Sequence, residues 1–284
     1  MQSSAPSSSP SDLRYCEVSG YRFAYREQGQ GQSVMLVHGS LADYRAWALQ
    51  MEAFATRYST IAISLRHCHP ERWDGTGNDF TVEQHADDLA GFIAARGAEP
   101  AHWIGHSRGG AVVLQLAVAH PELVRSLVLA DPGGLEALLP DSAEGRAMAR
   151  QSERMFEQLR DDLARGDVNA AARAFAETLG GPGAWERRTP AQRQMLLDNI
   201  TTGPACAQRP RFSRDQLAGI PAPMLLVTGM RSPPRYALML GELQRCNPRA
   251  SPPVIIPDAA HAMNRENPAA FNAKVLRFLV DHET

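Results

Sequence analysis

The stretch Ala-His-Trp-Ile-Gly-His-Ser-Arg-Gly-Gly-Ala-Val-Val-Leu-Gln-Leu-Ala-Val-Ala at residues 101–119 places one serine, Ser107, between a short apolar strand and an apolar helix. Its Gly-x-Ser-x-Gly pattern needs glycine at positions 105 and 109. A side chain at either position would collide across a turn sharp enough to push the serine hydroxyl out of the sheet. The stretch therefore predicts that Ser107 is a nucleophile.

Short β-rich runs and helix-length amphipathic stretches alternate on both sides of this turn. The expected strands are 22–26, 33–37, 60–65, 102–104, 126–130, 224–228 and 254–256. The expected helices between them are 47–57, 81–96, 108–120, 235–246 and 268–281. This alternation predicts an α/β fold: a mainly parallel sheet with helices on both faces and with the active residues at the carboxyl ends of the strands.

One interval, from residue 135 to 217, has no convincing strand but several helical segments, among them 147–165, 168–179 and 190–200. We therefore predict a helical cap at 135–215, inserted into a core domain formed by 13–134 and 216–284. A peripheral helical decoration is the alternative. Phe175, Trp185 and Met195 in this interval either line a pocket or simply pack the cap on the sheet. Residues 1–12, mostly Ser, Pro and Ala, predict a disordered tail that does not resemble a secretory signal.

Composition narrows the classes of partner. Hydrophobic residues make up 44% of the 284, and 29 Lys and Arg balance 31 Asp and Glu, so no strong field attracts nucleic acid or an acidic membrane. Apolar runs fall far below the roughly 18 residues needed to cross a bilayer. The four cysteines are scattered without Cys-x-x-Cys spacing, which favours reduced thiols in the cytoplasm. We expect a small-molecule substrate, no nucleic-acid or membrane partner, no cofactor or metal, and a monomer or small homo-oligomer.

A serine hydroxyl needs a neighbouring base to take its proton, and histidine is the usual base. His261 follows the last apolar strand and precedes the last helix, which places it at the same edge of the sheet as Ser107. His38, His102 and His106 lie within or beside strand ends and are expected to be structural neighbours. The sequence thus predicts His261 as the base.

The imidazole in turn needs a carboxylate at its far nitrogen. After the strand at 224–228, the position where an acid usually follows the glycine is Ser232, which cannot stabilise an imidazolium as a carboxylate does. Asp131 ends the preceding strand and is the predicted acid, although an aspartate that starts the turn into Pro132 is the local alternative. Asp258 and Glu266 are rivals, but both lie close to His261 in sequence, which makes the far-side geometry awkward.

Negative charge that develops on a substrate oxygen needs fixed hydrogen-bond donors. The backbone N–H of Arg108 follows the nucleophile at a helix start, where the helix dipole also favours an anion. The backbone N–H of Ser40, after the strand at 33–37, is the second predicted donor, with Leu41 as a substitute. These two amides are the predicted oxyanion hole.

The order of His38-Gly39, Gly105 to Gly109, Asp131 and His261 resembles the α/β-hydrolase fold family over roughly residues 20–284. The resemblance implies a sheet of eight strands with the cap inserted after the sixth, and a catalytic triad in the chain order Ser, acid, His. An acid after the sixth strand is a minority arrangement that the resemblance associates with some lactonases, dehalogenases and cofactor-independent dioxygenases. The position of the acid therefore does not predict the substrate class.

These observations predict a serine hydrolase that cleaves a carboxylic ester or lactone through an acyl-enzyme intermediate. Ser107 excludes the dehalogenases and epoxide hydrolases of this fold, which use a nucleophilic aspartate. Three alternatives stay open: a C–C bond hydrolase of a ring-fission product, a cofactor-independent dioxygenase that uses the His/Asp pair, and a receptor whose cap closes on a small molecule.

The segment Arg66-His67-Cys68-His69-Pro70 contains two histidines and a cysteine that suggest metal ligands. A metal site needs three or four converging groups, and no partner cluster is visible in the sequence. We expect this segment to shape one wall of the pocket instead.

Overall fold

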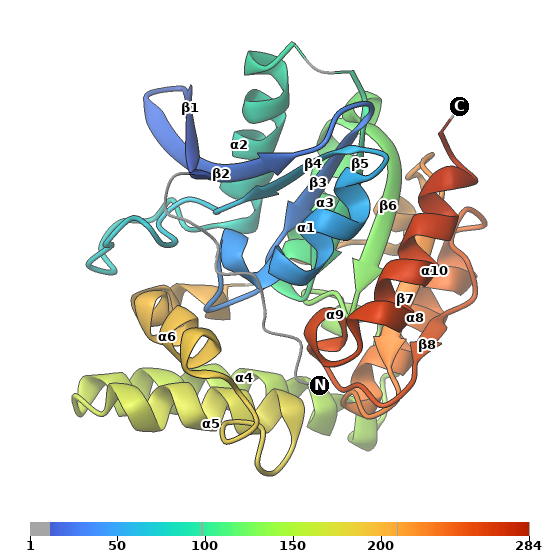
Figure 1. Ribbon diagram of the computed structural model, residues 1–284. Coiled ribbons are helices and arrows are strands. Elements are labelled where there is room, and N and C mark those ends of the chain that lie inside the picture. Colours follow the sequence, from blue (N-terminus) through green and yellow to red (C-terminus); the bar gives the residue numbers. More distant parts are fainter. Residues whose placement is uncertain (1–11, 98, 209, 284) are drawn as a thin grey trace, which may run out of the picture.

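The computed structural model describes residues 12–97, 99–208 and 210–283. Eight strands form one sheet in the order β1-β2-β4-β3-β5-β6-β7-β8 (Figure 1). Their bounds are β1 Arg14–Val18, β2 Tyr21–Gln28, β3 Ser33–Val37, β4 Ser59–Ile63, β5 Ala101–His106, β6 Val124–Ala130, β7 Met224–Gly229 and β8 Val254–Ile256. The fold class predicted from the sequence is confirmed.

The sheet is parallel from β4 to β8 and antiparallel at one edge, where β1 pairs with β2 and β2 with β4. In β3 the side chains of Val34 and Leu36 enter one hydrophobic cluster, and those of Met35 and Val37 enter the other. All four are fully buried, which is the pattern of a central strand covered on both faces.

Helices cover both faces of this sheet (Figure 1). Buried side chains of α1 (Ala48–Ala55) and α10 (Pro268–Val280) pack on one face, and those of α2 (Val82–Ala95), α3 (Arg108–Ala119) and α8 (Pro234–Cys246) pack on the other. Each fully buried Leu, Ile or Phe contributes roughly 1.5–3 kcal/mol. Short 3-10 helices connect the elements: η2 Tyr44–Trp47, η3 Pro121–Leu123, η4 Glu136–Leu138, η5 Ile200–Thr202 and η6 Pro204–Ala207.

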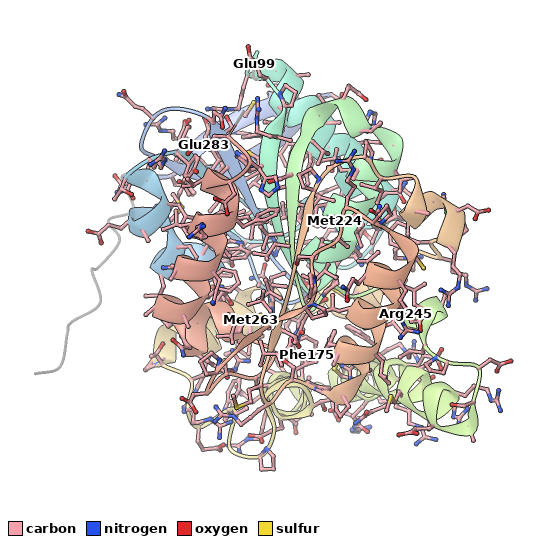
Figure 2. All side chains as sticks on the ribbon, turned by 90° about the vertical axis from the view of Figure 1, so that its right-hand side faces the viewer. Glu99, Phe175, Met224, Arg245, Met263 and Glu283 are labelled. Atoms are coloured by element: carbon pink, nitrogen blue, oxygen red, sulfur yellow. The ribbon has the colours of Figure 1, made fainter. Side chains whose placement is uncertain are left out.

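Between β6 and β7 the described residues form helices and turns but no strand. The helices are α4 (Ala143–Ala164), α5 (Val168–Gly180), α6 (Pro190–Asp198) and the short α7 (Arg214–Ala218). The first three lie together beyond the carboxyl ends of the strands, at the bottom of Figure 1. Figure 2 likewise places Phe175 of α5 at the opposite end of the molecule from Glu99, which precedes β5. This is where a cap over the strand ends has to lie.

An ion-pair network joins this helical region to the core. The carboxylate of Asp43, fully buried, accepts hydrogen bonds from Nε and Nη2 of Arg45 at 2.8 and 2.6 Å. The same Nη2 donates to Asp198 at the end of α6 at 2.8 Å, and the Asn199 amide donates to Asp43 at 2.7 Å. The side-chain Oδ1 of Asn199 accepts from the backbone N–H of His69 at 2.8 Å. The end of α6 is thus fixed to loops that follow β3 and β4.

The structure corrects the predicted elements in three places. The strand β1 was missed because its sequence, Arg-Tyr-Cys-Glu-Val, is polar and lies at an exposed sheet edge. Helix α4 begins at Ala143 rather than 147, because the Ser142 side chain caps it by accepting from the backbone N–H of Gly145. The short helix α9 (Met263–Glu266) was also missed. The tail predicted at 1–12 lies outside the described residues except for Asp12, which pairs with Arg26 at 3.1 Å. No helix in the described part of the chain is long and apolar enough to span a membrane.

Candidate active site

Ser107 stands at the junction of β5 and α3 in a conformation that side chains rarely adopt, with φ 53° and ψ −119°. A Cβ at Gly105 would lie 2.5 Å from the carbonyl oxygen of Gly109, and a Cβ at Gly109 would lie 2.2 Å from that of Val37. Neither position can carry a side chain without moving backbone. The prediction that glycine is required on both sides of the serine is confirmed, and the strained turn is of the kind that exposes a nucleophile.

His261 lies in the loop between β8 and α9, where three neighbours hold its ring and its backbone. Its Nδ1 lies 3.1 Å from Oδ2 of Asp131, and its backbone carbonyl accepts from Nε2 of His106 at 2.7 Å. The ring of Tyr236 stacks on the imidazole with centroids 4.8 Å apart and an interplanar angle of 18°. The Nε2 atom is buried and has no hydrogen-bond partner among the described residues. That nitrogen is free to take a proton inside the cavity that Ser107 also lines.

Asp131 is fully buried at the end of β6, in a backbone conformation with φ 42°. The hydroxyl of Ser232 donates to its Oδ2 at 2.6 Å and accepts from the backbone N–H of Gly229 at 3.1 Å. Ser232 occupies the position after β7 where the acid was missing from the sequence. It holds the displaced carboxylate instead of replacing it, a role that the sequence analysis did not foresee.

The two rival acids do not reach the imidazole. Asp258 is exposed, and its backbone carbonyl accepts from the Arg231 guanidinium at 2.7 Å. The Glu266 carboxylate accepts from the backbone N–H of Ala260 at 2.6 Å. Within the described part of the chain neither carboxylate hydrogen-bonds to His261. Of the three candidates, the structure brings only Asp131 to the imidazole.

Burial sets the protonation of the pair. It raises the pKa of Asp131 to about 7, against the opposing effect of the hydrogen bond from Ser232. It also lowers the pKa of His261 to about 3, with a further lowering by the positive charge of Arg235. Both shifts disfavour the charged form of a group that has left water. The resting imidazole is therefore neutral, as a proton acceptor must be.

The predicted oxyanion donors lie beside Ser107. A Cβ at Gly39 would lie 2.9 Å from the Cβ of Ser107, so the loop after β3 passes directly against the serine. Ser40 and Leu41 of this loop line the same cavity, and the backbone of Leu41 has φ 53°. Among the described residues, no hydrogen bond from the backbone N–H of Ser40 or Arg108 is present. The Arg108 side chain itself is buried and donates to the carbonyl of Phe80 at 3.1 Å.

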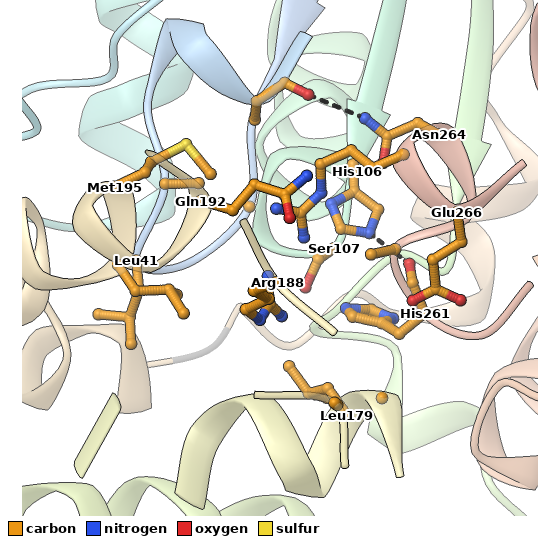
Figure 3. A pocket seen from close by; sticks show the side chains of 18 of the residues that line it. Leu41, His106, Ser107, Leu179, Arg188, Gln192, Met195, His261, Asn264 and Glu266 are labelled. Carbon is orange, nitrogen blue, oxygen red and sulfur yellow. Dashed lines mark hydrogen bonds between the residues drawn. The ribbon is translucent and has the colours of Figure 1, made fainter. Parts of the chain in front are cut away.

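The cavity above Ser107 has a volume of about 350 Å³ (Figure 3). Its walls come from the loop after β3, from α5 and α6, and from the segment around α9. Phe175 and Met195 line it, as one reading of the sequence allowed, whereas Trp185 packs beneath Arg193, whose guanidinium lies 5.4 Å from the ring centroid. Ser107 and His261 lie in this cavity together with Arg188, Arg265 and Glu266.

The Arg66-to-Pro70 segment does not line this cavity, so its predicted role as a pocket wall is wrong. The Arg66 guanidinium is drawn away to the carboxylate of Asp88 at 2.6 Å. Both ring nitrogens of His67 face carboxylates, those of Glu71 at 2.9 Å and Asp79 at 2.8 Å. No cluster of potential metal ligands occurs among the residues that the structure describes.

The sheet order, the strained serine turn and the buried Asp–His pair define an enzyme class. The profile of the Alpha/beta hydrolase family matches residues 34–274, and the chain belongs to this family. The family and the relatives described next indicate that the protein is a hydrolase.

Several relatives match most of this chain at low identity. 2-(Acetamidomethylene)succinate hydrolase of Mesorhizobium japonicum is 26% identical over 264 residues, which cover 89% of this chain and 90% of the relative. The dihydrolipoyllysine-residue acetyltransferase component of the acetoin cleaving system of Cupriavidus necator is 27% identical over 274 residues, 94% of this chain and 68% of that protein. A thermophilic esterase from Thermogutta terrifontis, solved with malate bound, has a TM-score of 0.75 at 26% identity and covers 96% of this chain and 99% of its own. The chain spans 43% of the length of mycobacterial relatives that match over 150 residues.

Proposed function

We propose that this chain is a serine hydrolase that cleaves a carboxylic ester or a lactone through an acyl-enzyme intermediate. One observation carries the proposal. The imidazole of His261 is held at Nδ1 by Asp131, 3.1 Å away, and its buried Nε2 has no partner among the described residues in the cavity that Ser107 lines. The relationship to the Thermogutta esterase, at 26% identity over nearly the whole chain, supports the ester as substrate class.

In the first half of the reaction, the Ser107 Oγ attacks the carbonyl carbon while Nε2 of His261 takes the hydroxyl proton. The carbonyl electron pair moves to the oxygen, which accepts hydrogen bonds from the backbone N–H groups of Ser40 and Arg108. The Asp131 carboxylate accepts a hydrogen bond from Nδ1–H of the imidazolium and stabilises its positive charge without taking the proton. Collapse of the intermediate breaks the ester C–O bond, and the imidazolium gives its proton to the leaving oxygen.

In the second half, the same imidazole takes a proton from water, whose oxygen attacks the acyl carbon. Collapse releases the carboxylic acid and returns the proton to Oγ of Ser107. With a lactone, the alcohol and the acid are parts of one product. We propose that residues 135–215 act as a cap over this chemistry, because Phe175, Leu179 and Met195 line the cavity that Ser107 also lines. We place the reaction in the cytoplasm, since the four cysteines are free thiols.

The test combines covalent labelling with turnover. A fluorophosphonate should modify Ser107, as peptide mass mapping can show, and a panel of short esters and lactones should be hydrolysed. Ser107→Ala should abolish labelling and lower kcat by a factor on the order of 10⁴–10⁶ with a nearly unchanged Tm. Ser59→Ala, which removes a hydroxyl bonded to Glu27 away from the cavity, is the control.

Labelling at another residue, or ester turnover that survives Ser107→Ala, would contradict the proposal. If the protein cleaved a ring-fission product but hydrolysed neither esters nor lactones, it would be a C–C bond hydrolase instead. Oxygen consumption in the presence of an aromatic ketone-like substrate would favour the cofactor-independent dioxygenase.

A further inference from the structure

Two arginines line the part of the cavity that lies between the helical region and α9. Arg188 lies between α5 and α6, and Arg265 lies in α9. Figure 3 shows Arg188 in the middle of the cavity, between Leu41 and His261. The two guanidinium groups therefore reach one cavity from segments far apart in the sequence.

Neither guanidinium has a partner among the residues that the structure describes. Nε of Arg188 and Nη1 of Arg265 are buried without a hydrogen bond, and among the described residues neither side chain forms an ion pair. Other cavity arginines differ, since Arg187 is exposed and donates to the carbonyls of Pro182 and Gly180 at 2.8 and 3.0 Å. An unsatisfied buried donor costs free energy, so a site of this kind is built to be completed by a ligand.

The pKa shifts of Arg188 and Arg265 indicate that the protein does not fully compensate their positive charges. Burial lowers the pKa of Arg188, and burial together with the charge of Arg188 lowers the pKa of Arg265 to about 9. Glu266 opposes both shifts from a distance, while its carboxylate is hydrogen-bonded to the backbone N–H of Ala260 at 2.6 Å. The three side chains together leave one positive charge facing the cavity.

We propose that Arg188 and Arg265 bind a carboxylate of the substrate, so that the enzyme acts on esters or lactones that carry a free carboxylate besides the scissile carbonyl. This inference rests on the proposed function and names its substrate class. The planar fork of an arginine matches a carboxylate in a bidentate arrangement. Arg187, Arg231 and Asp258 also line the cavity, and its charged side chains sum to a net positive charge that favours an anionic group on the substrate.

A second, smaller cavity limits the other end of the substrate. Its volume is about 40 Å³, and it shares Ser40, Ser107, Phe175 and Leu179 with the first. The remaining lining is mainly apolar, with Val82, Ala111, Met155, Phe156, Pro210 and Tyr236 among its members. The group on that side of Ser107 is therefore small.

Binding can be measured without turnover. Calorimetry of monomethyl succinate with Ser107→Ala should give an affinity that falls about 10- to 100-fold when Arg188→Gln or Arg265→Gln is added, the range expected for a lost charge-assisted hydrogen bond. Arg173→Gln removes an exposed arginine of α5 that pairs with Glu186 outside the cavity, and it should change the affinity less than twofold. Inorganic phosphate should bind more weakly than monomethyl succinate.

Turnover tests the same site through selectivity. The wild type should prefer monoethyl succinate to ethyl 4-methylpentanoate, in which a branched alkyl group replaces the carboxylate. Each arginine variant should lower the ratio of the two kcat/KM values by about 10- to 100-fold and leave kcat/KM for the neutral ester within about threefold. Both variants should keep or raise Tm in the absence of ligand, because they remove an unpaired charge from a partly buried side chain.

The outcomes separate the two proposals. Equal loss on both esters with a lowered Tm would assign the arginines a structural role and overturn the carboxylate site, as would tighter binding of phosphate. Ester turnover with no preference for the carboxylate would also overturn it and leave the serine hydrolase standing. Arginine-dependent binding without hydrolysis of any ester would support the carboxylate site and refute the proposed reaction.

Discussion

Asp43 and Asp131 are both fully buried aspartates near the carboxyl ends of strands, but their surroundings differ in one respect. The Asp43 carboxylate faces a cation, Arg45, at 2.6 Å and also accepts from Asn199. The Asp131 carboxylate has neutral partners, the hydroxyl of Ser232 and the imidazole of His261. A buried charge that the protein compensates fixes structure, whereas a buried charge left uncompensated is available for chemistry.

The same substitution at the two aspartates should separate these roles most strongly in activity. Asp131→Asn should lower kcat by a factor on the order of 10⁴, because the amide cannot hold the imidazole in the correct tautomer or stabilise the imidazolium. Asp43→Asn should lower kcat less than about tenfold. Steady-state assays on one ester measure both. Near-normal activity of Asp131→Asn, with collapse in Asp258→Asn or Glu266→Gln, would refute the assignment of the acid.

For stability we expect the reverse: the larger loss should come from the substitution at Asp43. Asp43→Asn removes the charge that pairs with Arg45 and places an amide against two donors. Breaking a fully buried pair costs about 3–5 kcal/mol, and since Arg45 is 29% exposed we expect roughly 2–4 kcal/mol here. Urea unfolding at pH 7.5 gives this value. A loss below about 1 kcal/mol would mean that the network does not anchor α6.

A smaller effect should appear in the pH dependence of stability. Because the folded pKa of Asp131 is raised to about 7, its protonated form stabilises the protein fully below pH 4, and this contribution is lost as the pH rises through about 7. Asp131→Asn cannot lose a proton. It should therefore be more stable than the wild type at pH 8, by roughly 1–3 kcal/mol, and about equal to it at pH 4.

At pH 8 His261 is neutral in the folded state and in the unfolded state, so it does not contribute to this difference. Thermal or urea unfolding of both proteins at the two pH values tests the prediction. A variant less stable than the wild type at pH 8 would show that the carboxylate is compensated after all.

The smallest expected effect concerns Ser232. Ser232→Ala removes a hydrogen bond of 2.6 Å to Asp131, which is worth about 1 kcal/mol, so kcat/KM should fall about fivefold. The acid limb of the pH profile should move upward, since this hydrogen bond lowers the pKa of Asp131. Ser251→Ala, whose hydroxyl bonds to the backbone of Leu226, is the control. If the acid limb of the pH profile did not move, Ser232 would have no role in holding Asp131.

Much of this arrangement was predictable from local sequence. The turn at Ser107 follows from two glycines, and the places of His261 and Asp131 follow from the ends of apolar strands. The edge strand β1 was missed because its partner, not its composition, makes it a strand. The bond between Ser232 and Asp131 joins residues 101 positions apart, and the unpaired state of Arg188 depends on what is not near it. Neither is encoded in a local pattern.

The glycine contacts around Ser107 also bear on how such an enzyme diversifies. A side chain at Gly39, Gly105 or Gly109 would collide with backbone or with Ser107. We therefore expect substitutions at these three positions to be rejected. Gln192 and Met195 face the cavity from α6, a separate element with its own capping box at Thr189. New substrate preferences are accordingly expected to arise by mutation of that helix, while the strained turn is inherited unchanged.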